Sequence, residues 1–90
     1  MSKSYIVIQQ YLCCNENGHW IEYVSDCVEF DKRYKAIKHG FKQQGSDDFN
    51  IGVIENERLV SFDWMNKSID ESAEKLAEIA EAIGYEGAAQ

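Results

Sequence analysis

The chain has 90 residues, which is enough for one small domain, and its formal net charge of −7 argues against a general nucleic-acid-binding protein. No apolar run is long enough to span a bilayer or to act as a signal peptide, so we expect a cytoplasmic protein. The three cysteines are odd in number and two are adjacent, which excludes the dense, even pattern of a secreted disulfide scaffold.

Residues 5–30 are predicted to form a β-hairpin. Residues 5–14 are rich in β-branched and aromatic residues, and the turn that follows contains Asn17-Gly18, a pair favoured in tight hairpins. Side chains alternate along a strand, so one face carries Ile6, Ile8, Leu12, Cys14, Ile21, Tyr23 and Cys27. The opposite face is also largely apolar and carries Tyr5, Val7, Gln9, Tyr11, Cys13, Trp20, Glu22, Val24, Asp26, Val28 and Phe30.

A helix is predicted next, from an N-cap at Asp31 to about Gln44, with Gly45 as its end. Its apolar stripe would consist of Tyr34, Ile37 and Phe41. Residues 32–42 hold five of the nine basic residues and no acid, whereas the rest of the chain carries 4 basic and 16 acidic residues. The sequence therefore predicts a basic helix on an acidic body.

A second hairpin is predicted around Asn56-Glu57, from Phe49 to Trp64. Simple alternation places one set of apolar residues on a single face: Phe49, Ile51, Val53, Val60, Phe62 and Trp64. The other face would carry Asn50, Gly52, Ser61 and Asp63, with Ile54 and Leu59 near the turn.

The last helix should begin at a capping box, residues 68–71, and end at Gly84. Its apolar stripe is Ile69, Ala73, Leu76, Ile79, Ala80 and Ile83, and residues 85–90 are expected to form a flexible tail. The order ββαββα predicts a single α+β domain spanning residues 1–90. We expect a two-layer sandwich, with a four-stranded antiparallel sheet and two helices on one face.

In such a sandwich one face of the first hairpin stays open. We assign the face with two acids, Glu22 and Asp26, to the open side, where it would continue to Gly52 in the second hairpin. A contiguous exposed apolar patch usually marks an interaction site. The predicted partner-binding residues are Tyr5, Val7, Tyr11, Trp20, Val24 and Gly52. Two alternatives remain: both faces are buried within one domain, or a second copy covers the open one in a homodimer.

No catalytic, cofactor or metal motif has a specific spacing. Cys13, Cys14, His19 and Cys27 match no common zinc-ligand pattern, so we predict neither a metal nor a cofactor. Asp47 and Asp48, with His39 nearby, could form an acid–base site, but short Asp-rich loops are usually solvated turns. We therefore predict no enzymatic activity.

The sequence favours a small acidic protein-interaction module of bacterial or phage type. It would bind a protein partner or itself through the apolar sheet face, with acidic surfaces setting partner choice. The alternative is a nucleic-acid-linked regulator. This would contact phosphates through the basic helix 32–42, at Lys35, Lys38 and Lys42, or would mimic nucleic acid through the acids of the last helix.

Overall fold

The computed structural model describes residues 3–45, 49–63 and 73–87. The elements follow the predicted ββαββα order, with one short strand added at the end. They are β1 (Ser4–Asn15), β2 (Gly18–Val24), α1 (Arg33–Gln44), β3 (Phe49–Glu55), β4 (Arg58–Phe62), α2 (Ala73–Ile83) and β5 (Glu86–Gly87). The α+β class is therefore confirmed.

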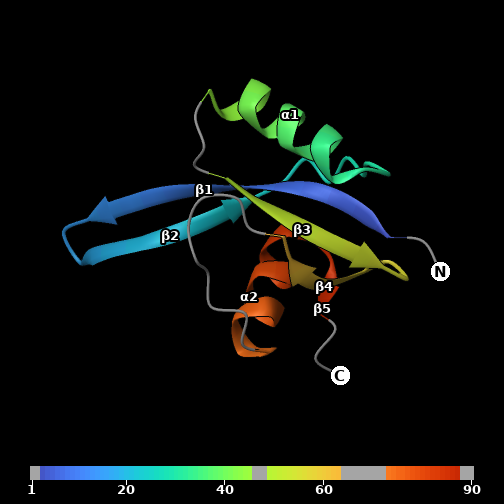
Figure 1. Ribbon diagram of the computed structural model, residues 1–90. Helices are drawn as coiled ribbons and strands as arrows, with labels where there is room; N and C mark the ends of the chain where they lie inside the picture. The colour runs from blue at the N-terminus through green and yellow to red at the C-terminus, as the bar shows by residue number, and fades with distance from the viewer. Residues whose placement is uncertain (1–2, 46–48, 64–72, 88–90) are drawn as a thin grey trace.

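One sheet holds all five strands in the order β2-β1-β3-β4-β5, where we predicted four strands (Figure 1). The long strand β1 organises this sheet. Its first half pairs antiparallel with β3, and its second half, from Gln9 onward, pairs antiparallel with β2. β5 pairs with β4 in parallel. β2 is the first strand in this order, so it lies at one edge of the sheet.

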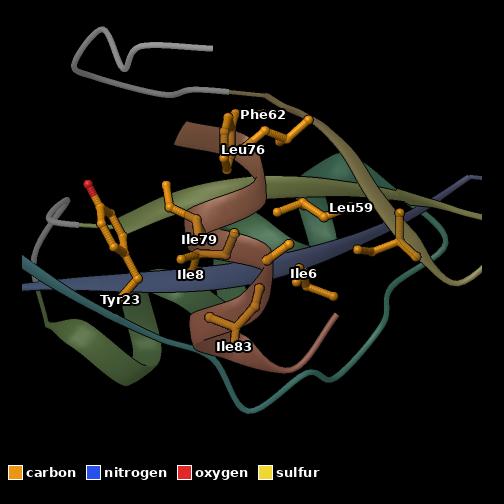
Figure 2. Packing of buried hydrophobic residues seen from close by; sticks show 10 residues of the cluster. Ile6, Ile8, Tyr23, Leu59, Phe62, Leu76, Ile79 and Ile83 are labelled. Atoms are coloured by element: carbon orange, nitrogen blue, oxygen red, sulfur yellow. The ribbon is translucent and has the colours of Figure 1, made fainter. Parts of the chain in front are cut away.

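The two helices lie on opposite faces of the sheet, so the prediction that both lie on one face was wrong (Figure 1). α1 packs through Ala36 onto Val7, Phe49 and Ile51. The larger core on the other face joins α2 to the sheet (Figure 2) and consists of Ile6, Ile8, Tyr23, Ile54, Leu59, Phe62, Leu76, Ile79, Ala80 and Ile83. The first half of β1 is apolar at odd and even positions because it is buried on both sides.

A β-bulge in the second hairpin supplies apolar residues to both cores. The register shifts between Val53 and Ile54, so that Phe62 pairs with Gly52. A one-residue shift moves every following side chain to the other face of the sheet. Phe62 therefore joins the α2 core, and the prediction that it shares a face with Phe49 was wrong.

α1 ends as predicted, at Gly45, which adopts the left-handed conformation with φ 71° and donates its N–H to the carbonyl of Phe41. It begins later than expected, with Lys32 rather than Asp31 at the N-cap. Its buried residues are Ala36 and Gly40, whereas the predicted stripe residues Tyr34 and Phe41 are exposed. Gly40 faces the ring of Phe49, so the helix lies too close to the sheet for a large side chain there.

α2 buries the predicted stripe from Leu76 to Ile83, and Gly84 ends it with φ 92°. The prediction of a flexible tail from residue 85 was wrong for its first residues, because Tyr85 packs against the core and Glu86–Gly87 form β5; residues 88–90 lie outside the described residues. Asp47, Asp48, Trp64 and the capping box 68–71 lie outside the described residues.

Candidate interaction surface

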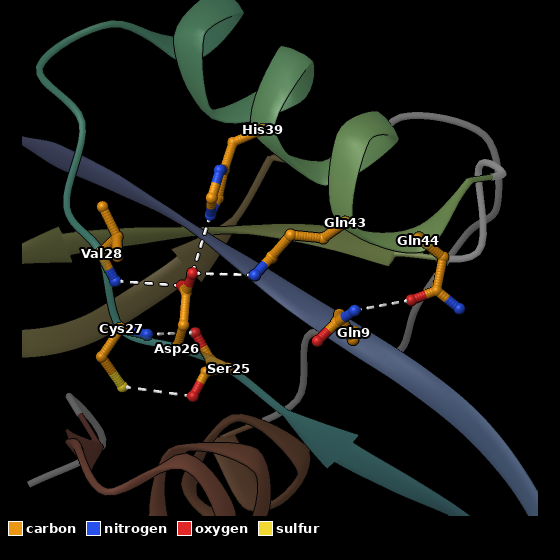
Figure 3. A network of polar contacts seen from close by, with 8 residues as sticks. All are labelled: Gln9, Ser25, Asp26, Cys27, Val28, His39, Gln43 and Gln44. Carbon is orange, nitrogen blue, oxygen red and sulfur yellow. Dashed lines mark hydrogen bonds and ion pairs between the residues drawn. The ribbon is translucent and has the colours of Figure 1, made fainter.

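The β1–β2 hairpin projects past both helices (Figure 1). The side-chain amide of Gln9 donates to Oε1 of Gln44, the last residue of α1, at 2.9 Å (Figure 3). Beyond this contact, residues 10–24 form a regular two-stranded hairpin with an unbroken register from Gln9↔Val24 to Asn15↔Gly18. We call residues 10–24 the arm.

Large apolar side chains are exposed on both faces of the arm. On the α1 side, Tyr11, Trp20 and Val24 are 41%, 44% and 47% exposed, and on the α2 side Ile21 is 43% exposed. Scattered exposed apolar residues are ordinary, but these four are neighbours on two paired strands. Clustering of this kind is typical of an interaction surface.

Three of the six predicted partner-binding residues lie elsewhere. Val7 is fully buried beneath α1, and Tyr5 is half-buried beside it, with its backbone bonded to that of Phe30. Gly52 is buried on the opposite face, where a Cβ atom would come within 2.8 Å of side-chain carbons of Ile8 and Leu59. These placements correct the prediction, because α1 covers the half of the open face that contains Val7.

Alternation along the chain assigned Ile21 to the face covered by the helices, but Ile21 is exposed. Its exposure follows from element lengths. A strand of twelve residues is about 40 Å long, whereas a helix of twelve residues is about 18 Å long. As far as the structure describes them, α1 has twelve residues and α2 has eleven. Part of a hairpin built on β1 therefore extends past both helices, one on each face of the sheet. The predicted strands and helices would already have allowed this comparison of lengths.

An open groove of about 330 Å³ runs between the β2 end of the sheet and α2. Its lining consists of Ile21, Glu22, Tyr23, Val24, Glu78 and Ala82. The ammonium of Lys75 lies 5.4 Å from the centre of the Tyr23 ring and 3.1 Å from Oε2 of Glu78. The groove is therefore lined by both apolar and acidic residues, and Lys75 pairs with the Glu78 carboxylate beside it.

The surroundings of the arm are acidic. Residues 4–31 contain five acids and no lysine or arginine. On α2, Glu74, Glu78 and Glu81 are all exposed. The charges that the arm itself carries are therefore acidic, which favours positively charged partners, although α1 adds Lys38 and Lys42 on its own side of the sheet.

A polar network fixes the segment between β2 and α1 (Figure 3). The carboxylate of Asp26 lies 2.7 Å from Nε2 of His39, and it accepts hydrogen bonds from the Gln43 side chain at 2.9 Å and the Val28 amide at 3.1 Å. Burial alone would raise the pKa of Asp26, but these partners outweigh it and the pKa is lowered. His39 thus joins α1 to the segment after β2; the Asp47–Asp48 loop, near which we expected it, lies outside the described residues.

The basic residues of α1 are only partly available for contact with anions. Lys35 forms an ion pair with Asp31 at 3.0 Å, and Arg33 forms one with Asp63. Lys38 and Lys42 are exposed on the helix. The predicted anion-contacting set therefore keeps its helical spacing, but one of its three members already has a carboxylate partner.

The three cysteines are free, and each has different surroundings. The thiol of Cys13 donates to Oε2 of Glu22 at 3.1 Å, which raises its pKa. The thiol of Cys27 donates to the carbonyl of Ile83 at the end of α2, and Cys14 is exposed. Within residues 3–45, 49–63 and 73–87, no three His, Cys, Asp or Glu side chains are grouped so that they could hold a metal ion.

No protein-family model matches the chain, and comparison with curated proteins and with solved structures found no significant match. In the part of the chain that the structure describes, no helix is long and apolar enough to cross a membrane. The arm, the groove beside it and the acidic charge around both are therefore the features from which a function must be argued.

Proposed function

We propose that the protein is a small non-enzymatic interaction module that binds a protein partner through the arm. The observation that carries this proposal is the exposure of Tyr11, Trp20 and Val24 on one face of a hairpin that projects past α1. Tyrosine and tryptophan are the side chains that most often dominate the binding energy of protein interfaces. Burying one large apolar side chain contributes about 1.5–3 kcal/mol.

The position of the arm also supports this role. The domain has its own cores on both faces of the sheet, and the side chains of Tyr11 and Trp20 belong to neither. The arm can therefore bind a partner while both cores stay intact. Mutations in the arm should then weaken binding without lowering the stability of the domain. A protein with an exposed apolar patch of this kind keeps its solubility through its charge, here −7.

The test is a double variant, Tyr11→Ala with Trp20→Ala, and its matched control is Tyr34→Ala, an exposed aromatic on α1. A photo-crosslinking amino acid at residue 20 of the full chain first identifies the partner in its native cells. Calorimetry with the purified partner then measures affinity. We expect the double variant to bind at least about 100-fold more weakly, with an unchanged urea midpoint, and the control to bind normally. Equal binding by all three proteins would contradict the proposal.

Self-association is the other use of the same surface, and it is measured directly. Size-exclusion chromatography with light scattering, from low to high micromolar concentration, gives the mass of the particle. A dimer that dissociates in the Tyr11→Ala/Trp20→Ala variant would place a second copy on the arm instead of a partner protein. A monomer across that range leaves the arm free for a partner.

The alternative function, a nucleic-acid-linked regulator, rests on the exposure of Lys38 and Lys42 on α1. It is weaker because Lys35 pairs with Asp31 and because the rest of the chain is strongly acidic. Binding to a DNA and RNA panel that weakens with salt and is lost in Lys38→Glu would favour direct contact. Competition with nucleic acid for a basic partner would instead favour mimicry.

A further inference from the structure

Within residues 3–45, 49–63 and 73–87, no strand pairs with the outer edge of β2. β2 lies at one end of the strand order, and among the described residues its only strand partner is β1. Every second residue of such a strand turns its N–H and C=O groups away from the sheet, where they can pair with another strand. Proteins usually block such an edge with proline, lysine or a bulge. β2 has none of these, and its one charged residue is Glu22.

The other edge of the sheet is organised differently. There β4 pairs with β5, a strand of two residues that carries the chain away from α2. A very short edge strand offers little backbone for pairing, and this is a recognised way to prevent strand addition. The two edges thus differ in the length of their outermost strand: β5 has two residues, paired with Arg58 and Leu59 of β4, and β2 has seven.

Apolar side chains are exposed on both faces of β2, which favours a partner that pairs along the strand edge over one that lies on a single face of the sheet. Trp20 and Val24 project on the α1 side and Ile21 on the α2 side, all three more than 40% exposed. A partner that lies on one face of the sheet covers only one of these sets. A strand added along the edge has side chains on both faces, and those side chains contact the cross-strand neighbours on each face.

The groove between β2 and α2 continues this edge. It contains the small residue Ala82 and the side of Tyr23, so it can accept an apolar side chain of an added strand. Glu78 borders the groove on the α2 side, and Glu22 projects on the α1 side of the same strand. When an apolar side chain of an alternating strand enters the groove, the lysine or arginine beside it projects on the α1 side, where Glu22 lies. Lys75 offsets part of the charge of Glu78, but Glu22 contacts only the Cys13 thiol among the described groups.

We infer that the edge of β2 binds an extended segment of a protein partner as a sixth strand of the sheet, and that this segment alternates apolar residues with lysine or arginine. The inference rests on the proposed function, for which it specifies the partner. In strand addition, backbone hydrogen bonds supply affinity and the pockets for alternate side chains supply specificity. The outward backbone groups of β2 would supply the affinity. The groove on one face and the Glu22 carboxylate on the other would supply the specificity.

Charge argues against a second copy as the occupant. A two-fold pairing of β2 with itself would place both α2 helices on the same face of the joined sheet, with the Glu78 side chains beside the junction. Each copy adds a net charge of −7, and no lysine or arginine lies within residues 4–31 to compensate it. Like charges brought together across an interface oppose association, whereas a basic segment is attracted.

The test uses three synthetic peptides of about eight residues, a common strand length. The first alternates valine and lysine, the second replaces lysine with glutamate, and the third keeps the first sequence but methylates alternate backbone nitrogens. The readout is amide hydrogen exchange of the full chain by NMR. We expect the first peptide alone to slow exchange of every second amide in β2. Since the third peptide has the same charge, it controls for non-specific attraction.

Two variants locate the site. Ile21→Lys introduces the protective lysine that natural edges carry, and we expect it to weaken binding of the valine–lysine peptide at least about ten-fold. Glu22→Gln removes the carboxylate on the face where the lysines lie when the valines enter the groove, and it should weaken binding about two- to five-fold, the range of one exposed ion pair. The matched control is Glu16→Gln, which removes an exposed acid in the turn of the arm. We expect no change in that variant.

The other outcomes overturn the inference in distinguishable ways. Equal binding of the first and third peptides would mean charge attraction without strand addition. Shifts confined to Tyr11 and Trp20, with β2 amides exchanging freely, would leave the proposed function standing and remove the edge from it. Protection of β2 that grows with protein concentration in the absence of peptide would identify a second copy as the occupant. No binding of the first peptide would overturn the edge proposal alone, because the partner experiment with Tyr11→Ala/Trp20→Ala is independent of it.

Discussion

Asp26 and His39 join the end of the arm to α1, with Oδ2 of the first 2.7 Å from Nε2 of the second. The two residues are thirteen positions apart, and nothing in their local patterns predicted the contact. The ring of His39 also lies against that of Phe30, with centroids 5.1 Å apart. The contact therefore ties three segments together: the stretch after β2, the residue that pairs with Tyr5, and the middle of α1.

The first prediction concerns pH. The pKa of Asp26 is lowered in the folded protein, so its contribution to stability is complete well above the ordinary carboxyl value of 3.8 and is lost as the pH falls through the folded pKa. Asp26→Asn should cost about 1 kcal/mol near neutral pH. That cost should shrink steadily below the ordinary carboxyl value. Urea unfolding at a series of pH values measures it, and a pH-independent difference would show that the charge of Asp26 is irrelevant.

The second prediction concerns the contact between α1 and the sheet. A Cβ at Gly40 would lie 2.5 Å from Cε1 of Phe49, whose side chain is fully buried and cannot move aside freely. Alanine favours a helix over glycine by about 1 kcal/mol, but overpacking costs about 1–3 kcal/mol. We expect Gly40→Ala to destabilise the fold by about 1 kcal/mol, since the steric cost is the larger.

The control for this contact is a second background. In Phe49→Leu the ring is absent, so adding Gly40→Ala should cost less than it does in the native chain, or even stabilise the helix. Lys38→Ala, at an exposed position of the same helix, should leave the urea midpoint nearly unchanged. Equal costs of Gly40→Ala in both backgrounds would show that Phe49 is not what keeps this position small.

The arrangement of the helices shows where sequence patterns stop being sufficient. Alternation in β1 separated its two faces correctly, and its first half is buried on both of them. It did not indicate whether a helix or a partner provides that cover, because this depends on the strand order. Once β3 pairs with the first half of β1, α1 can pack over Val7, and Tyr11 remains outside. The exposed surface was therefore predicted in part.

The bulge is a second feature that local patterns could not provide. Strict alternation put Phe62 with Phe49, and the shift between Val53 and Ile54 moved it to the α2 face. With this shift, Phe62 packs in the core under α2 while Phe49 stays in the core under α1. Because the advantage lies in packing between distant segments, the local pattern does not reveal it. The role of Gly52 also depends on its neighbours in space. A glycine within a strand indicates a close approach, and here the approaching groups are the side chains of Ile8 and Leu59 rather than a partner.

The third prediction concerns the turn of the second hairpin. Asn56 and Glu57 both have positive φ, at 53° and 65°, which is the pattern of a type I′ turn. Asparagine tolerates this conformation, but glutamate is strained in it. Glu57→Gly should raise the free energy of unfolding by about 0.5–1 kcal/mol. Glu57→Ala removes the same charge and keeps the Cβ, so it should give no such gain. Equal effects of the two variants in thermal unfolding would assign the change to charge rather than to the backbone.

The fourth prediction uses the arm itself. The thiol of Cys13 donates to Glu22 on the neighbouring strand, and this hydrogen bond raises the pKa of Cys13. The thiolate is the reactive form, so Cys13 should react slowly with iodoacetamide near neutral pH. Glu22→Gln removes the negative charge and should accelerate the reaction at Cys13, measured in a background where Cys14 is serine. Glu16→Gln, which removes an exposed acid at the tip of the arm, is the control and should leave the rate unchanged. A rate unaffected by Glu22→Gln would mean that this bond does not persist in solution, and the carboxylate would then be free for a basic partner.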